Sequence, residues 1–495
     1  MLDQSAIDQL RAAPIGPQSH LIGGAAVAAG DGGTLDVISP LDGGVLTTIA
    51  RGTEADMAAA IASARAAFDD GRWSGLAPAA RKKILFKWAD LIEANALELA
   101  VLGVRDNGTE IGTAYFAEPG SAVGTIRYYA EALDKVYGEI AVTDPSVLAM
   151  VQREPVGVVG AIIPWNFPLM IGAWKLGPAL AAGNCVVVKP AETASLSLLR
   201  MAELALEAGV PPGVLNVVTG EGPVVGKAMG LSMDVDVLVF TGSGGVGRQL
   251  MEYSARSNLK RVYLELGGKS PHIIFSDAPD LEQAAKAAAG SIFRNAGQVC
   301  VAGSRLLVQS DIHDDFVALV AEQAEAFKAG DPLQLSTSMG AVNSERQLKQ
   351  NLAFVADAPG QGARLIKGGG QVRRETGGYF MEPTIFADVR PDADIAQKEV
   401  FGPVLAITPF ADEAEAIALA NDTVYGLASG VWTADLGRAH RMVRAIRAGV
   451  VHVNTYGGAD GTVPLGGVRQ SGNGHDKSMH AFDKYMDLKT VWMRL

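Results

Sequence analysis

The sequence predicts an α/β fold built from doubly wound parallel sheets. Short apolar runs recur along most of the chain, and each is followed by turn residues and then by a helical pattern. Continuous apolar strands that alternate with helices are typical of a parallel sheet covered on both faces. The chain has 495 residues, and a single core stops growing at about 250–300, so we expect more than one such domain.

The expected strands are buried runs of valine, isoleucine and leucine. They span residues 156–164, 184–190, 215–220, 236–242, 272–275 and 304–309. We expect a helix over residues 53–68, with Thr53 as its N-cap, and one long amphipathic helix over residues 79–102. The strand–helix alternation restarts after Gly267–Gly268, so a domain boundary is expected there.

The run Val156 to Trp174 has 19 residues and no charge, which is long enough for a membrane helix. However, Pro164 and Pro168 bracket Asn166 at its centre. Two prolines would break a helix there and would leave an amide in lipid. We therefore expect a buried strand, a turn and then a helix.

Two segments depart from the alternation because they are strand-like and are followed by no helix. They are "YGEIAVTDPSVLAMVQREP" at residues 137–155 and "KYMDLKTVWMRL" at residues 484–495. Isolated strands far apart in sequence can pair as an extension, also onto another subunit.

The composition excludes several classes of function. Forty-two basic and 54 acidic residues give a net charge of −12, which argues against nucleic acid and anionic membrane as the main partner. Two cysteines make no disulfide framework, and no Cys/His cluster has the spacing of a metal site. The first residues lack a basic region and an apolar region of the kind found in secretory signals. We expect a cytoplasmic enzyme without a metal.

A G-x-G-x-x-G motif at Gly242, Gly244 and Gly247 follows a strand and opens a helix, as in a dinucleotide-binding turn. That motif expects an acid about 20 residues on to bind a ribose, which points to Glu265. Glu192, in "VVVKPAE" at the end of another strand, is a second candidate for the ribose. A glycine-rich turn without a ligand is the alternative, since 58 glycines make a chance match easy. The motif leaves these possibilities open.

Cys300, in "NAGQVCVAGSR", has two interpretations. Free cysteine is often a small buried hydrophobe, and this is our interpretation of Cys185 in "NCVVVK". A thiolate is also a strong nucleophile toward a carbonyl carbon. The residue alone does not decide between the two for Cys300.

Seven motifs together resemble those of aldehyde dehydrogenases and occur in the order seen in that family. They are "PWNFP", "VVVKPAE", "FTGSGGVG", "LELGGKSP", "GQVCVAGSR", "EVFGPVL" and "PLGGVRQSG", and the resemblance runs from about residue 35 to the C-terminus. Within the family, "YYAEALDKVYGE", "REPVGV", "TVPLGG" and "SGNGHDKSMHAFDKYMDLKTVW" look most like bacterial gamma-glutamylaminobutyraldehyde and omega-aminoaldehyde dehydrogenases.

The resemblance implies two Rossmann-like domains and a small β-strand oligomerisation arm. Residues 1–135 and 155–265 would form the dinucleotide-binding domain, and residues 266–477 the catalytic domain. Residues 136–154 and 478–495 would form the arm. The family forms dimers that often pair into tetramers, so we expect a homodimer or homotetramer.

The resemblance also implies a mechanism in which Cys300 attacks the aldehyde as nucleophile. Asn166 would stabilise the oxyanion of the thiohemiacetal, together with the Cys300 backbone N–H. Hydride transfer would leave a thioester, and Glu265 would then act as the general base for its hydrolysis to an acid. Lys175 and Asp476 would support this site from behind.

The resemblance assigns the cofactor to other residues, which resolves the two roles considered for Glu265. Lys189 and Glu192 would hold the adenosine ribose, and Ser243 the pyrophosphate; Glu399 and Phe401 would lie at the nicotinamide end. Further contacts are implied for Trp165, Gly242, Val246, Leu266 and Gln347. In the family a pair such as Thr-Glu follows T-G-S, whereas this chain has Gly244–Gly245, so the glycine motif is partly accidental. A carboxylate at Glu192 should repel a 2′-phosphate, so NAD is expected, with NADP possible because Lys189 would soften that repulsion.

The expected substrate pocket has aliphatic and aromatic walls with one acid. Its members would be Ile171, Trp174, Val299, Val301, Asp460 and Leu465. Asp460 could meet a cationic amine, and a solvated loop aspartate is the alternative. Leu465, where many relatives have phenylalanine, and Val468 should widen the pocket.

We therefore expect an NAD-dependent aldehyde dehydrogenase for an omega-amino or acylated aminoaldehyde. A broad aliphatic or aromatic aldehyde dehydrogenase is the close alternative. A coenzyme A-acylating enzyme and a non-catalytic relative are weaker ones, because Cys300, Glu265 and Asn166 are all present.

Overall fold

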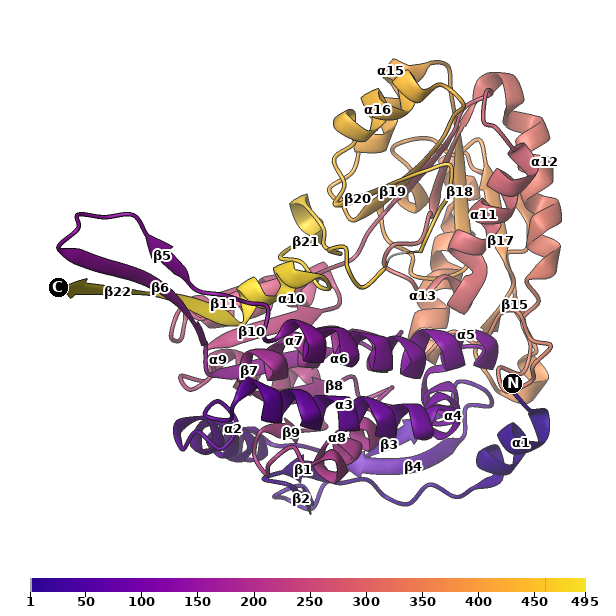
Figure 1. Ribbon diagram of the computed structural model, residues 1–495. Coiled ribbons are helices and arrows are strands. Elements are labelled where there is room, and N and C mark those ends of the chain that lie inside the picture. The colour runs from indigo at the N-terminus through magenta and orange to yellow at the C-terminus, as the bar shows by residue number, and fades with distance from the viewer. Residues whose placement is uncertain (1, 459) are drawn as a thin grey trace.

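The computed structural model describes residues 2–458 and 460–495. Their strands form two large, mostly parallel sheets, and helices pack around both of them (Figure 1). The larger sheet has the strand order β2-β1-β9-β8-β7-β10-β11-β21. Its strands are β1 (His20–Ile22), β2 (Ala25–Val27), β7 (Val158–Ile163), β8 (Cys185–Pro190), β9 (Leu215–Val217), β10 (Val237–Thr241), β11 (Arg261–Glu265) and β21 (Gly472–Asn473). The strands from β9 to β11 run parallel to one another. Such sheets bind ligands where the strand order reverses, which is between β7 and β10 here.

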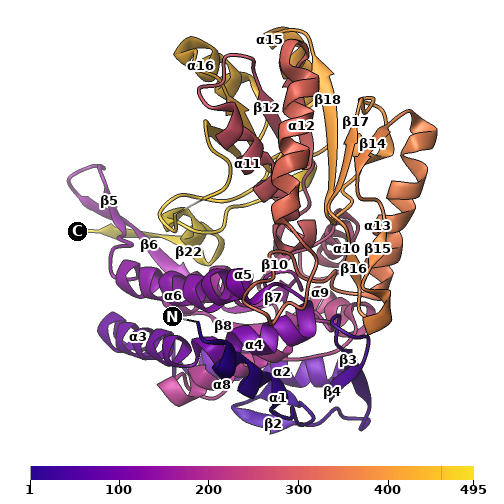
Figure 2. The same cartoon turned by 90° about the vertical axis from the view of Figure 1, so that its right-hand side faces the viewer.

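The second sheet has the order β14-β17-β18-β13-β12-β19-β20. Its strands are β12 (Pro271–Ile274), β13 (Arg305–Gln309), β14 (Arg364–Lys367), β17 (Thr384–Ala387), β18 (Val404–Phe410), β19 (Ala428–Trp432) and β20 (Val450–Val453). All neighbours pair in parallel except β14, which is antiparallel to β17. Two parallel-sheet units therefore make up the body, as predicted, and the chain passes from one to the other between β11 and β12 (Figure 2).

Helices cover both sheets. Around the first are α2 (Glu54–Asp69), α3 (Pro78–Ala94), α4 (Ala96–Asn107), α6 (Ser121–Ala132), α7 (Pro168–Ala182), α8 (Leu196–Ala208) and α10 (Gly244–Ala255). Around the second are α11 (Leu281–Phe293), α12 (His313–Gln323), α13 (Glu345–Asp357), α15 (Glu413–Asn421) and α16 (Leu436–Ala445). Shorter helices are α1 (Gln4–Ala12), α5 (Ile111–Tyr115), α9 (Lys227–Leu231) and α14 (Asp394–Gln397). Thr53 caps α2 as predicted, in a capping box with Asp56.

The prediction of one long helix over residues 79–102 is wrong. Asn95 ends α3 and precedes α4, with a ψ angle of 18° that leaves the helical region. Its side-chain Nδ2 donates to the carbonyl of Leu91 at 2.7 Å. An asparagine side chain that binds nearby backbone competes with the helix, which explains the break.

The two isolated strand-like segments pair with each other. β6 (Val147–Pro155) lies between β5 (Glu139–Ala141) and β22 (Met486–Arg494), and both pairs are antiparallel. The resulting three-stranded arm projects from the body, with the C-terminus at its end (Figure 1). The remaining strands form a hairpin of β3 (Thr34–Ile38) and β4 (Val45–Ala50), and the pair β15 (Gln371–Val372) and β16 (Phe380–Met381).

The uncharged run from Val156 forms β7, a turn and α7, as predicted from its two prolines. Both elements are almost wholly buried in the core of the first unit. Across the described residues, the structure contains no helix that is long and apolar enough to cross a membrane.

Candidate active site

A cavity of about 610 Å³ lies at the carboxyl ends of the central strands of the first sheet. The turns after β7, β8, β10 and β11 form one side of it. Segments of the second unit form the other side: Cys300, the start of α13 and the turn before β18. The cavity therefore lies between the two units, at the point where the strand order of the first sheet reverses.

Cys300 borders this cavity on a tightly fixed loop. It follows the short helix η3 (Arg294–Gly297), in which Asn295 and Ala296 have φ angles of 51° and 50°. Such left-handed backbone is costly for residues other than glycine and persists where the surroundings enforce it. No larger residue fits at Gly297, because a Cβ atom on it would lie 2.1 Å from the carbonyl oxygen of Gly402. The loop thus holds the half-buried sulfur of Cys300 in one place.

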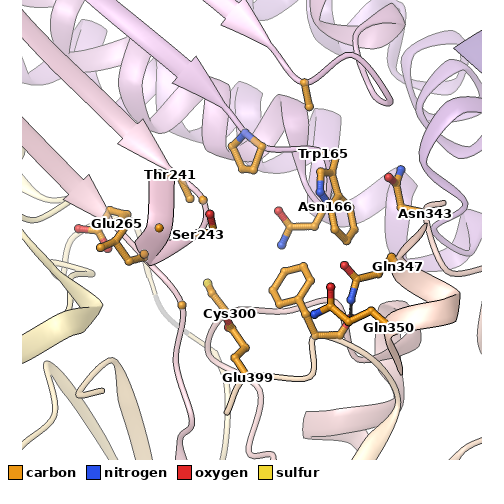
Figure 3. A pocket seen from close by; sticks show the side chains of 18 of the residues that line it. Trp165, Asn166, Thr241, Ser243, Glu265, Cys300, Asn343, Gln347, Gln350 and Glu399 are labelled. Carbon is orange, nitrogen blue, oxygen red and sulfur yellow. Dashed lines mark hydrogen bonds between the residues drawn. The ribbon is translucent and has the colours of Figure 1, made fainter. Parts of the chain in front are cut away.

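Asn166 lies in the turn between β7 and α7, where its side chain extends across the cavity toward Cys300 (Figure 3). Its Nδ2 donates to the carbonyl of Gln298 at 2.9 Å. The backbone N–H of Asn343 in turn donates to Oε1 of Gln298 at 2.8 Å. One N–H of the Asn166 amide is thereby bound to the Cys300 loop, and an amide nitrogen carries a second.

The thiol of Cys300 is a weak acid in this structure. Burial raises its pKa, and the nearby carboxyl groups of Glu399 and Glu265 raise it further, to about 12. At neutral pH the sulfur therefore carries its proton, so a base has to remove that proton before the sulfur can act as a nucleophile.

Glu265 ends β11 and lies at the far end of the cavity from Asn166, beyond Thr241 and Ser243 (Figure 3). Its side chain is buried, and its Oε1 has no hydrogen-bond partner among the residues that the structure describes. Burial and the charge of Asp476 raise its pKa well above the ordinary value, and the charges of Lys175 and Lys484 oppose that rise. A carboxyl group with a raised pKa is suited to proton transfer near neutral pH.

The turn after β8 carries an ion pair, of which Glu192 lines the cavity. Nζ of Lys189 donates to Oε2 of Glu192 at 2.8 Å. Burial alone would raise the pKa of Glu192, but the charge and hydrogen bond of Lys189 outweigh it and lower the pKa. Glu192 lines the cavity as a carboxylate, and Lys189 lies behind it.

The start of α10 shows which glycines of the G-x-G-x-x-G motif serve the fold. Ser243 is the N-cap, and its Oγ accepts from the N–H of Val246 at 3.4 Å. A Cβ on Gly247 would lie 3.0 Å from the Leu266 side chain, and one on Gly242 would lie 2.5 Å from the Phe240 ring. Gly242, Ser243 and Leu266 line the cavity, whereas the side chain of Val246 is partly exposed outside it.

The turn before β18 contributes Glu399 and Phe401. Oε1 of Glu399 accepts from the N–H of Gly268 at 3.0 Å, and burial raises the pKa of Glu399 to about 7. Phe401 has a φ angle of 56° and meets the Trp165 ring edge to face, with centroids 5.2 Å apart. Nε2 of Gln347 donates to the carbonyl of Val400 at 3.0 Å. This turn is therefore fixed by contacts from both units.

The residues expected in the substrate pocket divide into three places. Ile171, Trp174, Val299 and Leu465 pack together in one apolar cluster, which also includes Phe167. Asp460 lines a separate cavity of about 310 Å³, which Trp174 and Lys477 also line. Val301 belongs to neither, and its carbonyl accepts from the Tyr456 hydroxyl at 2.8 Å.

Several residues that line the large cavity were not found from the sequence. They are Thr193, Thr241, Arg248, Asn343, Ser344, Arg346, Gln350, Tyr425 and Gln470. Ser344 is the N-cap of α13. A serine just before a helical pattern indicates a helix start, so the sequence could have placed Ser344 there. Thr241 and Gln470 lie within two of the quoted motifs, but no role was assigned to them, and the remaining residues lie outside any motif. Among the described residues, no group of three or more His, Cys, Asp or Glu side chains is arranged to hold a metal ion.

Comparison with known proteins identifies the family. Residues 27–491 match the sequence profile named "Aldehyde dehydrogenase family". The chain belongs to the aldehyde dehydrogenase family. It is 49% identical over 475 residues to the NADP/NAD-dependent aldehyde dehydrogenase PuuC of Escherichia coli, covering 96% of this chain and 95% of that protein.

Two solved structures match over the full length of both chains. A crystal structure of an indole-3-acetaldehyde dehydrogenase in complex with NAD+ has a TM-score of 0.99 and is 50% identical. A gamma-glutamyl-gamma-aminobutyraldehyde dehydrogenase from Burkholderia cenocepacia has a TM-score of 0.98 and is 49% identical. These matches confirm the predicted α/β fold, the enzyme class and the nicotinamide cofactor. The protein is an aldehyde dehydrogenase that oxidises an aldehyde with NAD(P)+.

Proposed function

We propose that this aldehyde dehydrogenase oxidises an omega-amino or acylated aminoaldehyde, with Cys300 as nucleophile, Asn166 as oxyanion donor and Glu265 as general base. The observation that carries the proposal is that these three residues line one cavity, together with all the residues expected to hold NAD except Lys189 and Val246. Each role is inferred from the hydrogen bonds, protons or electron pairs that the side chain can donate or accept at its position.

The Cys300 thiol gives its proton to solvent water, and the sulfur then adds to the aldehyde carbon to form a thiohemiacetal. The carbonyl oxygen gains negative charge in this step. The second N–H of the Asn166 amide supports that charge, because the first is held by Gln298. This assignment makes Asn166 a fixed donor that does not titrate.

The residues at the cavity rim fit NAD. Glu192 can accept from the hydroxyls of the adenosine ribose, with Lys189 keeping it charged. Ser243, Gly242, Val246 and Leu266 surround the N-terminus of α10, where N–H groups favour a pyrophosphate. Glu399, Phe401, Trp165 and Gln347 line the nicotinamide end. These residues would hold NAD+, which would supply the hydride acceptor for the oxidation.

The last step is hydrolysis of the thioester on Cys300. Glu265 takes a proton from water, the oxygen attacks the thioester carbon, and the carbon–sulfur bond breaks to release the carboxylic acid. The raised pKa of Glu265 supports this role, since its carboxylate is a stronger base than one in water. A coenzyme A-acylating enzyme would not need this base.

We propose that NAD is preferred over NADP, because the Glu192 carboxylate would repel a 2′-phosphate. Replacing it in Glu192→Gln should raise the ratio of kcat/KM for NADP to that for NAD by about tenfold, or about 1.4 kcal/mol. Glu203→Gln is the control, because Glu203 pairs with Arg200 three residues away on α8 in the same way, outside the cavity. A higher kcat/KM for NADP in the unaltered enzyme would contradict the preference.

The proposed substrate class rests on the smaller cavity beside Trp174. Asp460 is exposed there, and a hydrogen bond from Thr462 lowers the pKa of its carboxyl, which keeps it charged. An aldehyde that reaches Cys300 past the apolar cluster could place a cationic group near Asp460. The likeness to the gamma-glutamyl-gamma-aminobutyraldehyde dehydrogenase supports this class.

A second candidate is an aromatic or aliphatic aldehyde. The apolar cluster of Phe167, Ile171, Trp174, Val299 and Leu465 favours it, because an indole or alkyl group would be well covered there. The likeness to an indole-3-acetaldehyde dehydrogenase supports it too.

Reduction of NAD with a panel of aldehydes separates the two candidates. The panel holds aminobutyraldehyde, its gamma-glutamyl derivative, butyraldehyde and indole-3-acetaldehyde. If amines are bound at Asp460, Asp460→Asn should lower kcat/KM for aminobutyraldehyde about fivefold, the size of one exposed ion pair, and leave butyraldehyde unchanged. Asp42→Asn is the control, since Asp42 binds the N–H two residues on, as Asp460 does. Leading activity with indole-3-acetaldehyde would favour the second candidate.

We also propose that the enzyme is a homodimer or homotetramer in the cytoplasm. The arm carries exposed apolar side chains at Ile140, Leu488 and Trp492, and β5 has an open edge that a partner strand could meet. Both cysteines are free, as the nucleophile requires, which suits a reducing compartment. A monomer by light scattering at micromolar concentration would contradict the assembly, and cell fractionation tests the compartment.

A further inference from the structure

A cluster of four buried ionisable side chains extends from the wall of the cavity, which Glu265 lines, into the protein behind it. Lys175 comes from α7, Glu265 from β11, Asp476 from the loop after β21, and Lys484 from the end of the short helix η9 (Met479–Lys484). The side chains of Lys175, Asp476 and Lys484 are at most 4% exposed. Sequence patterns gave no sign of Lys484, which lies at the start of a segment expected to be a strand.

Asp476 is bound by a lysine at each of its two oxygens. Nζ of Lys175 donates to Oδ2 at 2.5 Å, and Nζ of Lys484 donates to Oδ1. The backbone of Asp476 is fixed as well, because its N–H donates to the carbonyl of Leu465 at 2.7 Å and the Leu465 N–H donates back at 2.8 Å. The carboxylate therefore cannot turn without breaking a buried ion pair.

The two lysines balance the charge of two carboxyl groups. Asp476 and Glu265 together would carry two negative charges when both are ionised, and Lys175 and Lys484 supply two positive ones. Within the described part of the chain, Oε1 of Glu265 has no hydrogen-bond partner, so a charge on it is compensated by these lysines. A buried charge is costly unless it is compensated. Without Lys484, one lysine would face two carboxylates.

We propose that Lys484 is a positioning residue for thioester hydrolysis: it holds the second oxygen of Asp476 and supplies the charge that lets Glu265 act as a base. This inference rests on the role proposed for Glu265 in the reaction. Lys484 does not line the cavity and so touches neither substrate nor cofactor.

The electrostatic surroundings of Glu265 agree with this arrangement. Burial and Asp476 raise its pKa, while Lys175 and then Lys484 lower it. Burial lowers the pKa of Lys484, and Asp476 and Glu265 raise it. The other titratable groups facing the cluster are Cys300, Tyr129, Tyr485 and Lys477, from α6 and the loops around the site. Loss of Lys484 should therefore raise the pKa of Glu265.

A higher pKa of Glu265 should slow hydrolysis at neutral and acid pH. The base form of Glu265 is the carboxylate, which is present above its pKa. In Lys484→Gln, which keeps a hydrogen-bond donor without the charge, the acid limb of the kcat–pH profile should move up by about one pH unit. At pH values on the acid side of that limb, the steady-state rate of Lys484→Gln should be about tenfold lower than that of the unaltered enzyme. The formation of NADH in the first turnover should change little, because it precedes hydrolysis.

The first experiment is the kcat–pH profile, together with mass spectrometry of acid-quenched enzyme in the steady state. Lys484→Gln should accumulate the acyl thioester on Cys300 at neutral pH and lose that excess at high pH. Lys484→Met is the second neutral variant, since an apolar side chain of similar length can replace a buried lysine if glutamine does not fold. Lys484→Arg restores the charge and should move the limb back toward that of the unaltered enzyme.

Lys260→Gln is the matched control. Lys260 is also buried, but its Nζ donates to the carbonyl of Gly230 and to Ser257 Oγ rather than to a carboxylate. This variant should lose stability without moving the limb. An unmoved limb in folded Lys484→Gln or Lys484→Met, with no acyl enzyme, would overturn the inference. If Glu265→Gln itself leaves hydrolysis intact, the proposed base is wrong, which is a separate outcome.

Discussion

The two cysteines of this chain lie in very different places, and this difference indicates their function better than the acidity of their thiols does. Cys185 opens β8 in the middle of the larger sheet, paired with Val158 of β7, and is fully buried. Cys300 lies on a loop between the two units and borders the large cavity. Both are free thiols.

Burial raises the pKa of both thiols to about 12, so acidity does not distinguish them. Their neighbours do. The carboxyl groups of Glu399 and Glu265 are close enough to Cys300 to raise its pKa, and the Asn166 amide is bound to its loop. Around Cys185 the charges come from arginine–aspartate pairs, whose effects oppose each other. The difference indicates that a base and a donor beside a thiol, rather than a low pKa, mark the nucleophile here.

The largest expected effect comes from replacing each cysteine by alanine. Cys300→Ala should lower kcat on the order of 10^4-fold or more, since loss of a nucleophile removes the covalent route. Cys185→Ala should leave kcat within about twofold, because no catalytic group lies beside it. Steady-state NADH formation with the best aldehyde of the panel measures both. Comparable losses in the two variants would end the distinction.

The next largest effect is expected at Asn166, the amide donor that lies beside Cys300. Asn166→Ala should lower kcat by about 10²–10³-fold, or about 2.7–4 kcal/mol of barrier, as expected for an oxyanion donor. Because Asn166 also binds Gln298, the loop has to be shown to stay in place. Asn166→Asp keeps the size of the side chain but removes both of its N–H groups, including the one that donates to the Gln298 carbonyl, so an equal loss in the two variants would support a role as donor. Full activity in folded Asn166→Ala would exclude that role.

Alkylation compares the two thiols directly. With a pKa of about 12, the thiolate of Cys300 should increase ~tenfold for each pH unit from 7 to 10, and iodoacetamide labelling should follow. Cys185 should label only through local opening of the sheet and so much more slowly. Peptide mass spectrometry assigns the label to one cysteine or the other. Rapid labelling of Cys300 at neutral pH without such a rise would show that its pKa is far below 12.

The fold could be predicted because its evidence is local. β7 and β8 are continuous apolar runs, and the prolines at 164 and 168 fix the turn that carries Asn166. The same local evidence failed at Asn95, where one side-chain hydrogen bond divides a pattern that looks like a single helix.

The site could be predicted only in part, because some of its contacts join residues far apart in the chain. The ion pair of Lys175 and Asp476 spans 301 positions, and Lys484 lies in a segment whose pattern indicates only strand. Asp460 and Val301 fell on the expected loops, but only the three-dimensional arrangement separates them from the apolar cluster. The roles of the predicted residues stay predictions until the variants are measured.

The smallest expected effect concerns the stability that Cys185 contributes. Removing one buried sulfur in Cys185→Ala should lower the free energy of unfolding by about 1 kcal/mol, because the neighbouring valines of the sheet cannot fill the space. Cys185→Ser should cost more, about 1–3 kcal/mol, because a buried hydroxyl would need a hydrogen-bond partner within the apolar core in which Cys185 is packed. Midpoints of thermal unfolding at one scan rate rank the variants, with Cys300→Ala as the control at a half-buried position. If Cys185→Ser were as stable as Cys185→Ala, a polar partner would have to lie beside Cys185, and its assignment to the core would be wrong.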